Sequence, residues 1–92
     1  MRAVAEAFLG DVPEQIDRLG ALVAANDVRQ ATAQAHKIKG AAANVGGMAL
    51  SAAAEAMERA GKAGDLAAMA QGSTGLERQF AQLKAAMDEA LS

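Results

Sequence analysis

The sequence predicts an all-α protein, an antiparallel up-and-down four-helix bundle with a short extra N-terminal helix. Strong helix formers such as alanine, leucine, methionine, glutamate and glutamine dominate, while aromatic residues make up 2% of the chain. Apolar residues recur at intervals of three and four, and Gly, Asn and Asp separate the periodic stretches. Because 92 residues are enough for one modest core, residues 1–92 are expected to form a single domain.

The first part of the chain predicts two helices. A short leading helix is expected over residues 2–9 and should end at Gly10. The next helix is expected from about residue 12 to 25, because Asp11 offers an N-cap and Pro13 suits a first helical turn.

Two further helices are predicted in the middle of the chain. The first follows the stop at Asn26 and Asp27 and covers about residues 28–44. Its inward stripe contains Val28, Ala31, Ala35, Ile38, Ala42 and Val45. The second follows two glycines, 46 and 47, and ends at Gly61 and Gly64. Its inner stripe contains Leu50, Ala53, Ala54, Met57 and Ala60, and its solvated outer face contains Glu55, Glu58, Arg59 and Lys62.

The last helix is predicted to follow Asp65, which caps it, and to run to the end of the chain. Its apolar stripe contains Leu66, Met69, Ser73, Leu76, Phe80, Leu83, Met87 and Leu91. The stripe keeps its phase across Gly72 and Gly75, so we expect one helix with a weakened segment there.

Composition excludes several functions. The formal charge of −2 and a pI near 5.2 leave no cationic excess, so no nucleic-acid partner is expected. No stretch approaches the roughly 20 apolar residues of a membrane span, so we expect no membrane insertion and a cytoplasmic protein. The chain has no cysteine and one histidine, which leaves no expected metal site, disulfide or thiol chemistry.

His36, the single histidine, lies just outside the inward stripe of its predicted helix. Lys39 and Gly40 share its face at offsets of three and four, whereas Lys37 lies about 100° around the helix. A lone surface histidine beside lysines is usually an ordinary solvated residue. Gly40 has two interpretations as well, since a mid-helix glycine marks either a close helix crossing or the approach of a partner.

The segment from Ala35 to Gly46, AHKIKGAAANVG, resembles the phosphorylation helix of histidine phosphotransfer (HPt) domains. The family pattern is a histidine, a variable residue, an aliphatic residue, lysine and glycine, then small residues and a glycine that ends the helix. The matching residues are His36, Ile38, Lys39, Gly40 and Gly46. The flanking FLGDVPEQIDRLGALVAANDV and AGDL segments also resemble the family, so the resemblance covers essentially the whole chain.

The resemblance implies a phosphorelay intermediate without autonomous kinase activity. His36 would accept a phosphoryl group from a receiver-domain aspartate and pass it to another receiver, in response regulators or hybrid histidine kinases. No cofactor is expected in this domain, and Mg²⁺ would come with the receiver. Lys39 would stabilise the phosphoryl charge, Lys37 would add secondary charge or docking contacts, and Gly40 would leave room for the partner.

The resemblance also draws attention to Glu58. Some family members carry a polar residue on the next helix, often glutamine, that accepts a hydrogen bond from the other ring nitrogen of the histidine. Glu58 corresponds to that position. A carboxylate there would orient the ring and stabilise its cationic form, but its charge would oppose a nearby phosphoryl group.

Two alternative functions remain open from the sequence. One is a helical docking or dimerisation module without covalent chemistry, in which His36 is incidental. The other is the phosphoacceptor domain of a chemotaxis-type histidine kinase, which carries a similar histidine motif but receives its phosphate from an ATP-binding domain. Acceptance of an acid-labile, alkali-stable label from a phosphorylated receiver would separate the phosphorelay function from a docking module.

Overall fold

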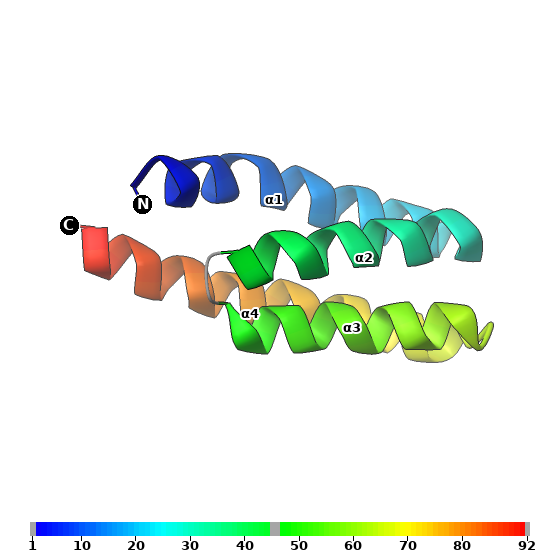
Figure 1. Ribbon diagram of the computed structural model, residues 1–92. Coiled ribbons are helices and arrows are strands. Elements are labelled where there is room, and N and C mark those ends of the chain that lie inside the picture. The colour runs from blue at the N-terminus through cyan, green and yellow to red at the C-terminus, as the bar shows by residue number, and fades with distance from the viewer. Residues whose placement is uncertain (1, 45–46, 92) are drawn as a thin grey trace.

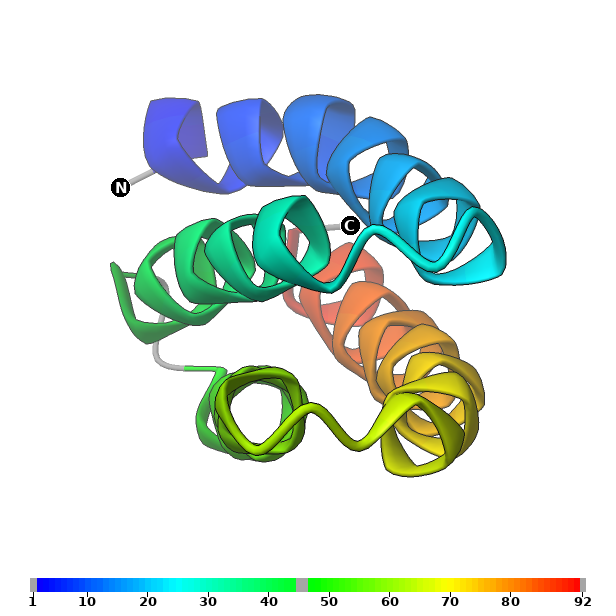
Figure 2. The ribbon, with the colours of Figure 1, turned by 90° about the vertical axis from the view of Figure 1, so that its right-hand side faces the viewer.

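The computed structural model describes residues 2–44 and 47–91, with side-chain surroundings for residues 10–44 and 47–89. This part of the chain forms four helices and no strand: α1 (Arg2–Ala24), α2 (Val28–Asn44), α3 (Met48–Lys62) and α4 (Leu66–Leu91). Successive helices run in opposite directions along a bundle of 41 × 17 × 17 Å (Figure 1). Each helix packs against two others, and the first and last helices, α1 and α4, also contact each other, which closes the bundle (Figure 2). The predicted all-α bundle is confirmed.

The short extra N-terminal helix is a wrong prediction. Residues 2–9 are the first turns of α1, which continues through Gly10 and Pro13 to Ala24, so Asp11 lies inside a helix and is no N-cap. Glycine lowers helix stability by about 1 kcal/mol relative to alanine, and a proline inside a helix removes one backbone hydrogen bond and costs about 3 kcal/mol, but α1 continues on both sides of Gly10 and Pro13. The continuous α1 extends beyond α2 and α3 at the end of the bundle where α4 also extends (Figure 1).

The predicted boundaries of α2 and α4 and the start of α3 are confirmed, whereas Gly61 lies inside α3, which ends at Lys62. Asp27 caps α2 through a 3.2 Å hydrogen bond from the Gln30 amide to Oδ1. Asp65 caps α4 in the same way, with the Ala68 amide 3.0 Å from Oδ1. α4 is one helix across both of its glycines. The predictions for residues 45 and 46 fall outside the described residues.

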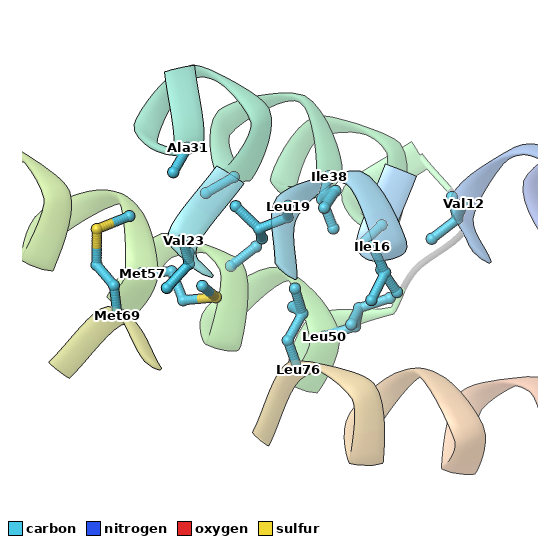
Figure 3. Close-up of a cluster of buried hydrophobic side chains, with 13 residues drawn as sticks. Val12, Ile16, Leu19, Val23, Ala31, Ile38, Leu50, Met57, Met69 and Leu76 are labelled. Carbon is cyan, nitrogen blue, oxygen red and sulfur yellow. The ribbon is translucent and has the colours of Figure 1, made fainter. Parts of the chain in front are cut away.

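The core lies along the bundle axis and receives side chains from all four helices (Figure 3). Its buried members are Val12, Ile16, Leu19, Val23, Ala31, Ala35, Ile38, Ala42, Leu50, Ala54, Met57, Met69 and Leu76. Burial of a large apolar side chain contributes roughly 1.5–3 kcal/mol, so these residues fix how each helix is rotated about its own axis. The second half of α4 is less buried, and Phe80, Leu83 and Met87 only partly cover the core.

None of the described helices is both long and apolar enough to cross a membrane.

α3 lies close against α2 at Gly61. A Cβ added there would clash with the side chain of Thr32 and would also come within 3.2 Å of Met69. The Thr32 hydroxyl is held by a 2.7 Å hydrogen bond to the Val28 carbonyl, so it cannot easily move away. A glycine at this crossing therefore lets α3 lie close against the helix that carries His36.

Candidate functional site

His36 lies near the middle of α2, and the core residues of that helix turn it outward. Ala35 and Ile38 on either side of it are fully buried, whereas 65% of the His36 side chain is exposed. Gly40 and Ala43 are exposed on the following turns. A Cβ added at Gly40 would meet nothing within 4 Å, so Gly40 does not mark a helix crossing. The predicted exposure of His36 on an open face is confirmed.

Glu58 of α3 contacts the imidazole from the side. Its Oε2 atom lies 3.0 Å from Nδ1 of His36, and its side chain is only 9% exposed. The prediction that Glu58 belongs to the solvated outer face is therefore wrong. The buried stripe of α3 contains Ala54, Met57 and Gly61. Glu58 lies at the edge of this stripe, where it contacts His36 and Lys39 of α2.

Glu58 also forms ion pairs with two lysines. Lys39 of α2 forms an ion pair with Glu58, with Nζ 2.9 Å from Oε1. Lys62, one turn along α3, places Nζ 3.4 Å from Oε2. Lys39 and His36 therefore contact different oxygens of the same carboxylate. Glu58 links the ammonium group of Lys39 to the imidazole of His36.

The contacts with Lys39 and His36 lower the pKa of Glu58 from 4.5 to about 2. The close contact with Lys39 is the largest cause, burial opposes it by raising the pKa, and His36 adds a further lowering. Glu58 is therefore ionised near neutral pH and can only accept hydrogen bonds. Because an anionic acceptor faces Nδ1, the neutral imidazole carries its proton on Nδ1 and keeps a lone pair on Nε2. Nε2 is then the ring nitrogen that carries the lone pair.

The remaining site residue, Lys37, lies on the other flank of His36. It is exposed and lines a groove between α2 and α1, away from Glu58. The site thus has an α3 flank, which holds Glu58, Lys39 and Lys62, and an α1 flank, which holds Lys37. Sequence reasoning did not assign Lys62 to the site, although its spacing of four from Glu58 is the signal that could have done so.

The described residues contain no group of three or more His, Asp or Glu side chains placed to hold a metal ion.

Comparison with known proteins gives one match: the family model of the Hpt domain matches residues 3–91. No curated protein and no solved structure is significantly similar to the chain.

Proposed function

Because this chain belongs to the Hpt domain family, we propose that it accepts a phosphoryl group from a receiver-domain aspartate onto His36 and passes it to a second receiver. Family membership assigns the chain to phosphorelay histidine phosphotransfer. The observation that carries the specific proposal is the contact between an exposed imidazole and a buried carboxylate, with Nδ1 of His36 3.0 Å from Oε2 of Glu58. Such a contact holds a histidine in the orientation and tautomer that a nucleophile needs.

In the proposed step, the lone pair on Nε2 of His36 attacks the phosphorus atom of the aspartyl phosphate. The N–P bond forms as the P–O bond to the aspartate breaks, and the aspartate leaves as a carboxylate. Nδ1 keeps its proton, so the phosphorylated ring is cationic, and the carboxylate of Glu58 stabilises that cation. Transfer to the second receiver runs through the same atoms in reverse.

The two lysines balance the charge of the phosphoryl group. Lys39 and Lys62 both contact Glu58, so two ammonium groups face a single carboxylate before any phosphoryl group arrives. The surplus positive charge offsets the repulsion between Glu58 and the phosphoryl oxygens. The receiver would bring its aspartate and Mg²⁺, and this domain would position the nucleophile, which is the main demand of phosphoryl transfer.

The test is phosphotransfer from purified receiver domains of the source organism, each charged with labelled acetyl phosphate and Mg²⁺. We expect at least one receiver to label the protein in an acid-labile, alkali-stable form, and the His36→Gln variant to stay unlabelled. A docking or dimerisation module would take no label. A chemotaxis-type phosphoacceptor would be labelled by ATP and a kinase's ATP-binding domain, and this outcome would contradict the proposed phosphoryl donor.

A further inference from the structure

A groove lies between α3 and α4 at the end of the bundle where α3 begins. Its volume is about 260 Å³, and it is lined by residues 47–50 and by Gln79, Gln82 and Leu83 of α4. The two helices pack against each other (Figure 2). A water molecule occupies about 30 Å³ in the liquid, so the groove has room for a side chain.

Met48 is an apolar side chain that projects into solvent beside this groove. It is the first residue of α3 and is 73% exposed. Among the side chains that the structure describes, no other large apolar residue is exposed. Methionine is flexible and polarisable, so it adapts well to the groove of a partner. The same surface therefore presents both a projecting apolar side chain and a groove that can receive one.

The surface continues from the groove along both helices without an ionisable side chain. On α3 it is formed by residues at spacings of four and three, which are Ala49, Ala53, Ala56 and Ala60. On α4 it is formed by residues at the same spacings, which are Gly75, Gln79, Gln82 and Ala86. These residues, together with Met48, are the α3–α4 face. All of them are at least partly exposed, although charged residues make up 22% of the chain.

Contacts between α3 and α4 place the two rows on one side of the bundle. A Cβ added at Gly72 would come within 2.8 Å of Met57, so this side of α4 faces α3. A Cβ added at Gly75, three residues further on, would meet nothing within 4 Å, so the surface is open there. At the groove, Gln79 and Gln82 lie beside Ala49.

The α3–α4 face lies away from the proposed phosphorylation site. Glu58 contacts His36 and Lys39 on the side of α3 that packs against α2. Ala56 and Ala60 are each two residues from Glu58, which places them about 200° around the helix from it. A molecule that covers the α3–α4 face would therefore leave His36 open.

We propose that the α3–α4 face binds a second copy of this chain. In a dimer with two-fold symmetry the same surface meets itself, so the surface must be complementary to itself in shape and in charge. Met48 and the groove meet the shape requirement, because Met48 of each copy can enter the groove of the other.

The charge requirement is met by the absence of ionisable side chains from the α3–α4 face. Each copy has a formal charge of −2, and a charged face would bring like charges together in a symmetric dimer. Gln79 and Gln82 each carry both a donor and an acceptor, so their amides can pair with the same residues of the second copy. Alanine and glycine at the other positions let two helices approach closely.

The size of the face sets the expected affinity. The 15 residues of α3 span about 22 Å and the bundle is 17 Å across, so the face covers about 400 Å². This area is about half of the roughly 800 Å² that each partner buries in a standard interface. The dimer is therefore weak and reversible, with a Kd on the order of 100 µM.

The test is sedimentation velocity of the purified protein over concentrations from about 10 µM to about 1 mM. The wild type should shift from monomer to dimer. The Met48→Glu/Gln82→Glu double variant brings like charges together and should raise Kd by at least about ten-fold. The matched control is Ala21→Glu/Gln30→Glu, which makes the same charge change at exposed positions of α1 and α2 and should dimerise like the wild type.

Cross-linking provides a second measurement that leaves the charge of the face unchanged. The chain has no cysteine, so Met48→Cys introduces a single thiol. A short bismaleimide should join two copies of Met48→Cys and leave Ala21→Cys, which is also exposed, mostly monomeric. Circular dichroism would show which variants keep their helices, and the cross-linking result decides the question if the double variant does not fold.

Three results would overturn the inference: a wild type that stays monomeric at about 1 mM, equal dimerisation of the two double variants, or equal cross-linking at positions 48 and 21. Neither measurement uses a receiver or a phosphoryl group. Failure of the dimer would therefore leave the proposed function standing, and failure of the proposed function would leave the dimer standing.

Discussion

Replacement of Glu58 by glutamine should remove a pH-dependent part of the stability of this protein. The folded-state pKa of Glu58 is about 2 instead of 4.5, chiefly because of Lys39 and with a smaller contribution from His36. A lowered folded-state pKa contributes stability that is complete above the unfolded value and is lost as pH falls through the folded value. The contribution of Glu58 is therefore complete above about pH 5 and disappears between about pH 4.5 and pH 2.

The structure also limits the size of this effect. A pKa shift of this size corresponds to at most about 3–4 kcal/mol in the free energy of unfolding. Two of the three groups that contact Glu58, His36 and Lys62, are 65% and 69% exposed, so solvent screens their charges. We therefore expect the carboxylate to contribute about 1–2 kcal/mol near neutral pH.

The measurement is urea unfolding of the wild type and Glu58→Gln, followed by circular dichroism at several pH values between about 6 and 2.5. The wild type should be more stable at the upper end, and the difference should shrink toward zero at the lower end. Glu55→Gln is the control, because Glu55 forms a more exposed pair with Arg59 and should cost less than about 0.5 kcal/mol at pH 6. A difference between wild type and Glu58→Gln that stays constant over the whole range would refute the argument.

Three further predictions follow from the site and its support. His36→Gln should abolish phosphoryl acceptance while changing the free energy of unfolding by less than about 0.5 kcal/mol, measured by labelling and urea unfolding. Lys39→Ala should slow transfer or shorten the phosphohistidine lifetime by about ten-fold or less, and time courses at two salt concentrations should show a smaller effect at high salt. Gly61→Ala should destabilise the fold by about 1–3 kcal/mol because of Thr32, whereas Gly40→Ala, which meets open space, should stabilise it by up to about 1 kcal/mol in the same unfolding assay.

The sequence predicted the fold well where helical periodicity and capping agree. The buried stripe of α2, with Ala31, Ala35, Ile38 and Ala42, follows directly from spacings of three and four. That stripe also predicts an exposed His36, because His36 falls outside the stripe's spacings of three and four. The break near Gly10 was wrong because Gly10 was taken as a stop and Asp11 and Pro13 as the start of a new helix, although a glycine or a proline inside a helix lowers its stability without always ending it.

The environment of Glu58 shows why periodicity could not predict the whole site. A pattern rule assigns a charged residue beside an apolar stripe to solvent, since burial of an unpaired carboxylate is costly. That cost is offset here by Lys39 and His36, which belong to another helix and are more than 18 residues away along the chain. Whether Glu58 is buried thus depends on how α2 and α3 pack, which the spacing within α3 does not specify. The same packing makes Glu58 ionised, and an ionised Glu58 accepts a hydrogen bond from Nδ1 of His36, which leaves the lone pair of the neutral ring on Nε2.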